Sequence, residues 1–156
     1  MIKINVLAVG KVKEKYFSDA IAEYSKRLSR FCQFTITEIK EENFENVTDG
    51  LIEVILEKEA QRILPHLKGE VFAMAIEGEK YTSTAFAKHI NKLSNLTDCI
   101  TFVIGGSYGL SDTVKKRAKG LISFSDMTFP HTFFRVMLLE QTYRAFSIIN
   151  GISYHK

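Results

Sequence analysis

Three loops in the C-terminal half of the chain carry residue types that could bind a ligand. They read IEGEK at the end of residues 71–76, GGSYGL after residues 99–104 and SDMTFPH at the end of residues 121–125. Each loop follows a predicted strand, and parallel strands place their carboxyl ends at one edge of a sheet. If the three strands are parallel, the three loops therefore line a common crevice. Adjacent glycines such as Gly105 and Gly106 let backbone approach a ligand closely, although a structural turn explains them equally well.

The glycine spacing argues against the common nucleotide-binding motifs. G-G-x-x-G differs from the dinucleotide fingerprint G-x-G-x-x-G, and the chain has no Walker A loop. The predicted first strand is followed by Gly10 alone, so a cofactor site is not expected at the first strand–helix turn. Cys32 and Cys99 are far apart and join no Cys/His cluster, which predicts reduced thiols and no metal site. A nucleotide-like cofactor would therefore be bound by the C-terminal half.

The final helical segment and the tail bring charged and ring side chains to the same half. Glu140 and Arg144 are four residues apart, which favours a structural salt bridge. Arg135 is equally consistent with a structural pair and with a contact to phosphate or carboxylate. His131 lies near the loops, while Tyr154-His155-Lys156 at the C-terminus is either a frayed end or part of a site.

Hydrophobic periodicity predicts the elements that must position these residues. Strands are expected over residues 2–9, 34–39, 71–76, 99–104 and 121–125, and helices over residues 15–31, 50–65, 83–96, 111–120 and 132–149. The alternation predicts an α/β fold with three layers and a mostly parallel sheet. No repeat, linker or boundary interrupts it, so residues 1–156 are expected to form a single domain.

Residues 132–149 are apolar around nearly the whole helical circumference, so two faces of this helix must be covered. The sheet can cover one face, and a second copy of the chain is the natural cover for the other. The sequence therefore predicts a homodimer. No apolar run is long enough to span a membrane and no signal peptide is recognisable, so a cytoplasmic protein without a membrane partner is expected.

Charge is unevenly distributed along the chain. Residues 1–31 carry a net charge of +4, residues 41–59 carry −6 and residues 111–120 carry +3. The two basic segments could together form a surface that meets phosphates, but charge alone favours a pair of solvated helix faces.

Several segments together resemble the RlmH family of SPOUT-class methyltransferases, which modify pseudouridine in large-subunit ribosomal RNA. The matching segments are LAVGKVKEKY, EKEAQRIL, VIGGSYGL, FSDMTFPH, RVMLLEQTYRAF and the closing YHK. They occur in the family's order and spacing over the whole chain, which is more specific than any single glycine loop.

The resemblance implies a C-terminal trefoil knot whose three loops fold around S-adenosyl-L-methionine. The implied cofactor contacts are Met74, Gly105, Phe124, Ser125, Asp126, Met127, Thr128 and Phe129. Two positions depart from the family's usual pattern, Tyr108 where an acid or amide is common, and Met74-Ala75 where Leu followed by an acid is frequent. Backbone contacts would survive both changes, whereas side-chain hydrogen bonds would not.

The resemblance further implies methyl transfer to N3 of a pseudouridine in 23S rRNA, a nitrogen whose proton must be removed. His155 is the expected base, Tyr154 would stack on or hydrogen-bond the target base, and Arg135 or Lys156 would hold its phosphate. The tail is expected to reach the partner subunit's pocket, and the ribosome rather than DNA is the expected partner. The alternatives are a SPOUT methyltransferase for another RNA position, an inactive ribosome-binding factor, or a flavodoxin-like regulator.

Overall fold

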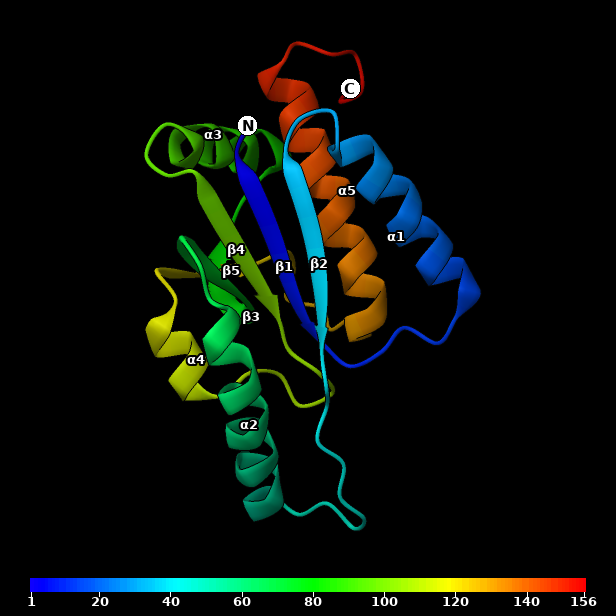
Figure 1. The fold of residues 1–156 in the computed structure, drawn as a ribbon, viewed down its shortest axis with the longest axis vertical. Coiled ribbons are helices and arrows are strands. Elements are labelled where there is room, and N and C mark those ends of the chain that lie inside the picture. Colours follow the sequence, from blue (N-terminus) through cyan, green and yellow to red (C-terminus); the bar gives the residue numbers. More distant parts are fainter.

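The computed structural model describes residues 1–156, which fold around one sheet of five parallel strands (Figure 1). The strands are β1 (Lys3–Val9), β2 (Gln33–Ile39), β3 (Glu70–Lys80), β4 (Cys99–Ile104) and β5 (Gly120–Ser123). Their order in the sheet is β2-β1-β4-β3-β5, and every pairing is parallel. The strands therefore direct all their carboxyl ends to one edge, as the arrowheads in Figure 1 show.

Helices cover both faces of this sheet and produce the predicted three layers. They are α1 (Lys15–Leu28), α2 (Asp49–Ile63), the single 3₁₀ turn η1 (Leu64–His66), α3 (Ser83–Ser94), α4 (Asp112–Arg117) and α5 (His131–Ile149). Alternate residues of β1 enter two separate cores, with Val6 packed under α1, α3 and α5, and Leu7 packed under α2 and α4. This alternation is the period of two that a strand buried on both faces requires.

Hydroxyl side chains cap the N-termini of three helices. Thr48 accepts a hydrogen bond from the backbone N–H of Leu51, and Thr82 does the same for Ala85. Ser111 caps α4 by accepting from Val114. These caps satisfy amide groups that would otherwise lack partners in the first turn.

Strand β3 differs from the predicted segment because it continues to Lys80. Met74 and Glu79 both align with Ile122 of β5, so the intervening residues 75–78 are looped out of the ladder. Gly78 permits this bulge because a Cβ there would lie 2.6 Å from the backbone nitrogen of Ile122. The predicted IEGEK loop is therefore an excursion within a strand.

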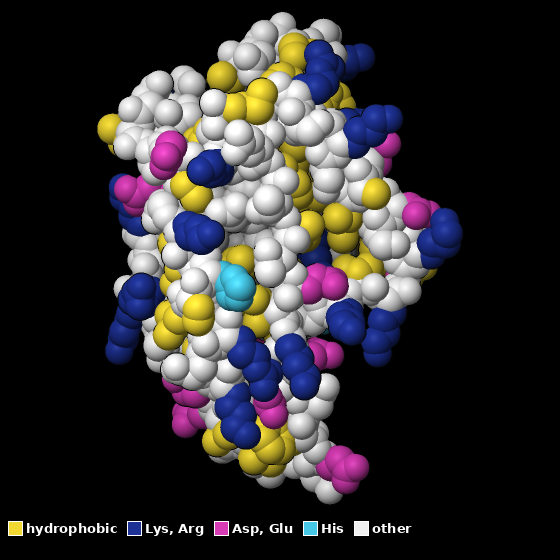
Figure 2. Space-filling model, viewed as in Figure 1, with side chains coloured by type: hydrophobic (Ala, Val, Ile, Leu, Met, Phe, Trp, Pro, Cys, Tyr) yellow, Lys and Arg dark blue, Asp and Glu magenta, His cyan; other side chains and the backbone are white.

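The two basic segments lie on opposite faces of the sheet, since α1 belongs to one helical layer and α4 to the other. The helices α1 and α4 therefore do not share a face of the sheet. In Figure 2, Lys and Arg side chains are scattered over the visible face with acidic side chains among them, which agrees with the solvated-face interpretation. None of the helices is both long and apolar enough to cross a bilayer.

Candidate functional site

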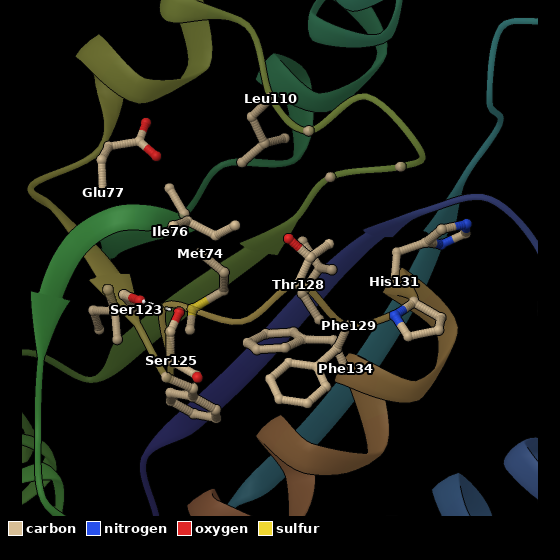
Figure 3. A pocket seen from close by; sticks show the side chains of 18 of the residues that line it. Met74, Ile76, Glu77, Leu110, Ser123, Ser125, Thr128, Phe129, His131 and Phe134 are labelled. Atoms are coloured by element: carbon tan, nitrogen blue, oxygen red, sulfur yellow. Dashed lines mark hydrogen bonds between the residues drawn. The ribbon is translucent and has the colours of Figure 1, made fainter.

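A cavity of about 760 Å³ opens at the carboxyl edge of the sheet, between the ends of β3, β4 and β5 and the start of α5 (Figure 3). All three predicted loops contribute to its walls. Of the residues expected to bind a cofactor, those that line it are Met74, Gly105, Phe124, Ser125, Met127, Thr128 and Phe129. The three loops singled out in the sequence therefore lie around one common cavity.

Asp126 is the exception among the expected contacts. Its side chain is 81% exposed and forms an ion pair with Lys80 on the outside of the loop, so it does not line the cavity. The loop turns at this point because Ser125 Oγ accepts a hydrogen bond from the backbone N–H of Met127, at 3.0 Å. The turn directs the flanking residues inward and Asp126 outward.

The glycine loop after β4 is folded tightly against itself. The N–H of Gly109 donates to the carbonyl of Gly106 at 3.1 Å, and Gly109 has φ of +85°. A Cβ on Gly105 would lie 2.3 Å from the carbonyl oxygen of Gly109. Gly105 is required by this close backbone approach, and the loop leaves room for a ligand beside bare main chain.

The excursion of β3 forms another wall and carries a charged group. Glu77 accepts a hydrogen bond from Lys115 Nζ of α4 at 2.6 Å, and the ammonium lowers the pKa of the Glu77 carboxyl. Glu77 lies on the same side of the cavity as the apolar Ile76 and Leu110 (Figure 3). Glu77 and Lys115 were not expected at the site, because their proximity depends on the bulge.

His131, at the start of α5, lines the far end of the cavity. Its Nδ1 atom is buried without a hydrogen-bond partner, and burial, together with the nearby Arg135 charge, lowers the pKa of the imidazole. His131 is therefore neutral near pH 7 and can accept or donate one hydrogen bond. Its place beside the SDMTFPH loop marked it in the sequence, although no role followed from that.

Arg135 lies completely buried one turn further along α5. It donates to the carbonyl oxygens of Val9 and Gly10 at 3.0 and 2.8 Å, and to Glu38 at 2.9 Å. The guanidinium thus joins the ends of β1 and β2 to α5 and cannot reach a phosphate in this conformation. Burial corrects the expectation that Arg135 contacts RNA and favours the structural alternative.

The C-terminal tail folds back on the end of α5. Tyr154 donates to Glu140 at 3.1 Å and packs edge-on against Tyr143, and His155 Nδ1 lies 3.2 Å from Arg144. Glu140 and Arg144 form the predicted salt bridge. The tail is therefore not frayed, but it lies at the end of the molecule opposite the cavity (Figure 1). A helix as long as α5 separates the two by about 28 Å, so one chain does not bring Tyr154 and His155 to its own cavity.

Comparisons with known proteins agree with this arrangement. The family described as "Predicted SPOUT methyltransferase" matches residues 2–155. The chain belongs to the SPOUT methyltransferase family.

Relatives of higher identity narrow the position of the chain within this family. The chain is 49% identical to "Ribosomal RNA large subunit methyltransferase H" of Limosilactobacillus reuteri, with 99% of this chain and 100% of the relative covered. It is 51% identical, with the same coverage, to the protein of that name from Bifidobacterium adolescentis. The sequence resemblance to this methyltransferase family is thereby confirmed.

Two solved structures share the fold at low identity. A probable methylase family protein from Haemophilus influenzae has a TM-score of 0.53 and 11% identity, covering 99% of this chain and 70% of that one. A putative methyltransferase from Legionella pneumophila, solved with bound SAM, has a TM-score of 0.52 and 12% identity, covering 92% and 66%. The trefoil knot that the resemblance implies stays a prediction.

Proposed function

We propose that the protein transfers a methyl group from S-adenosyl-L-methionine to N3 of a pseudouridine in 23S rRNA, in the cytoplasm. The observation that supports the proposal is the cavity, which is formed by the three loops that the sequence resemblance implies for the cofactor. The full-length relatives near 50% identity carry the name of a large-subunit rRNA methyltransferase. The particular nucleotide and atom rest on the family resemblance.

The residues around the cavity fit S-adenosyl-L-methionine. The volume lies within the roughly 300–1,000 Å³ typical of small-molecule sites. Apolar walls such as Met74 and Ile122 suit an adenine ring, and the backbone beside Gly105 suits close polar contacts. Tyr108 is 45% exposed and Met74 faces the cavity, so the two departures from the family pattern leave this space open.

When bound, the cofactor supplies an activated methyl group on a sulfonium sulfur. Phe124 and Phe129 would exclude water from the reacting centre, and the glycine loop would fix the orientation of the adenosine. His155 remains our proposed acceptor for the N3 proton, with Tyr154 against the target base and Lys156 at its phosphate. Arg135 would act only by holding the sheet edge and α5 in register.

A homodimer would bring the tail and the cavity together. The outer face of α5 carries a second, smaller cavity of about 390 Å³ between α1 and α3. Its apolar members include Phe133, Val136 and Met137. If α5 of a second copy packed antiparallel on this face, two-fold symmetry would carry the C-terminal end of each α5 toward the other's cavity. We propose that His155 and Tyr154 act there in trans.

The test is a methyl-transfer assay on intact ribosomes and on stripped rRNA, with mass mapping of the product. Labelled methyl at N3 of one pseudouridine supports the proposal, while a different nucleotide would favour a SPOUT enzyme for another RNA position. His155→Ala should reduce methylation far more than cofactor affinity measured by calorimetry. Absence of saturable S-adenosyl-L-methionine binding would instead favour an inactive ribosome-binding factor.

A further inference from the structure

The charged groups at the cavity are few and belong to one pair. Among the residues that line it, only Glu77 and Lys115 carry full charges at neutral pH besides the titratable His131. Two of the hydroxyl groups already have partners within the protein, since Ser123 Oγ donates to the Ser125 carbonyl and Ser125 Oγ accepts from Met127. The hydroxyls of Ser107, Tyr108 and Thr128 also line the cavity, but they are neutral. The fully charged side chains that a charged ligand can meet in this cavity are therefore those of Glu77 and Lys115.

The pair also has unused hydrogen-bonding capacity. Lys115 Nζ has three donors and meets one partner, Glu77 Oε1, at 2.6 Å. The second carboxylate oxygen of Glu77 has no side-chain partner, and the Glu77 side chain is 56% exposed at the rim. Two donors and one oxygen are thus available beside a cavity whose interior is largely apolar.

The opposite charges of Lys115 and Glu77 determine which kind of ligand the pair can bind. A simple anion would be attracted by Lys115 but repelled by Glu77. A simple cation would be attracted by Glu77 but repelled by Lys115. A nucleoside polyphosphate is disfavoured because the only cation is already neutralised. A zwitterion matches both groups, because its carboxylate can take the free lysine donors while its ammonium meets the free glutamate oxygen.

We infer that Lys115 and Glu77 form the recognition site for the α-carboxylate and α-ammonium of a nucleoside-linked amino acid. The inference rests on the proposed function, in which the ligand is S-adenosyl-L-methionine, and assigns its amino-acid end to one rim of the cavity. The β3 bulge is what makes the site, because it lifts Glu77 out of the sheet toward α4. A bulge at a ligand site is a recurrent way of aiming one side chain.

A purely structural role is the competing explanation, since an ion pair between a strand and a helix can simply hold the two together. Two matched ligands separate the explanations. S-adenosylhomocysteine and 5′-methylthioadenosine share the adenosine and a neutral sulfur, but only the first carries the amino-acid group. A recognition site affects the first ligand alone, whereas a structural pair affects both.

Calorimetry on the full-length chain measures both ligands against wild type, Lys115→Met and Glu77→Gln. We expect Lys115→Met to weaken S-adenosylhomocysteine binding by about tenfold or more and to leave methylthioadenosine within about twofold. Glu77→Gln should act in the same direction, and Lys115→Arg should keep most of the affinity. Lys116→Met is the matched control, because Lys116 is an exposed neighbour on α4.

Equal losses for both ligands, or no loss for either, would overturn the inference and leave the pair as a structural link. A wrong proposed function would give a different result, because the wild-type protein would then bind neither S-adenosylhomocysteine nor 5′-methylthioadenosine. Circular dichroism and the melting temperature of each variant accompany the titrations. If Lys115→Met does not fold, the same comparison in Glu77→Gln and Lys115→Arg decides the outcome.

Discussion

At the scale of single residues, the fold changes the properties of groups whose type alone says little. His131 and His89 both have lowered pKa values, chiefly because burial disfavours the charged imidazole. Tyr154 shows the same effect in a phenol, whose pKa burial raises to about 12. The tail tyrosine therefore stays protonated and remains a hydrogen-bond donor across the physiological range.

Stability should fall on the acid side of neutrality because of these histidines. A base whose pKa is lowered by folding binds fewer protons in the native state than in the unfolded state, so the free energy of unfolding rises with pH in that window. We expect the free energy of unfolding to be nearly constant above about pH 6.5 and to decrease as the pH falls below that value. Urea titrations from pH 5 to 8 measure this, and His131→Asn should flatten the dependence. If the free energy of unfolding depended on pH as in wild type in both His131→Asn and His89→Asn, the two histidines would not be the cause.

The same property can be observed directly by NMR. The imidazole Cε1–H resonance of His131 should titrate at a lower pH than the ordinary imidazole value of about 6.5, because burial disfavours the charged ring. A His131 midpoint at or above the ordinary imidazole value would show that the cavity does not keep this ring neutral.

Arg135 illustrates how burial decides between two roles. Replacement by Met removes the donor to two carbonyl oxygens and to Glu38, and should lower the free energy of unfolding by about 3 kcal/mol. Arg27→Met is the control, since its pair with Glu23 is on the surface and should leave stability nearly unchanged. Urea unfolding compares the two, and an equally stable Arg135→Met would show that the buried contacts contribute nothing.

At the scale of elements, the site depends on the close packing of main chain in the glycine loop that follows β4. Gly105→Ala would place a methyl group 2.3 Å from the Gly109 carbonyl oxygen, so the loop must open and cofactor affinity should fall by roughly tenfold or more. Gly50→Ala on α2 meets no atom within 4 Å and should bind the cofactor normally. Calorimetry of both variants checks this, and wild-type affinity in Gly105→Ala would refute it.

The helices follow local rules that the sequence already contains, such as the caps at Thr48, Thr82 and Ser111. The end of β3 does not follow them. An apolar run predicts a strand over residues 71–76, but the continuation to Lys80 depends on pairing with β5 after the bulge. That pairing joins residues more than forty positions apart in the chain, so local periodicity cannot reveal it.

At the scale of the whole molecule, the proposed site needs two chains. We expect Met137→Glu, which places a charge in the α5 groove, to shift the protein from dimer to monomer in light scattering and to abolish methylation. Val54→Glu is the control, because Val54 is an exposed apolar residue on α2 in the other helical layer. A monomeric wild type, or an active Met137→Glu monomer, would contradict a composite site.

Mixed dimers test directly whether the tail acts in trans. At a cofactor concentration well below the Kd of the Gly105→Ala variant, dimers of that variant bind little cofactor, and dimers of His155→Ala lack the proposed base. After mixing and exchange, a heterodimer would combine one intact cavity with the intact tail of the other chain, so about one quarter of wild-type activity should return. No recovery, with exchange verified by mass, would place the tail in its own subunit or outside the reaction.

The sequence by itself determined the layer architecture and the three loops, because these depend on hydrophobic period, helix caps and glycine positions that are local. The individual residues expected at the cavity came from the family resemblance. The structure places the side chain of Asp126 outside the cavity and buries Arg135. It also brought Glu77 to Lys115 and His131 to the cavity. These outcomes required the tertiary structure because each depends on which distant segments become neighbours, and burial and charge pairing arise only from that packing.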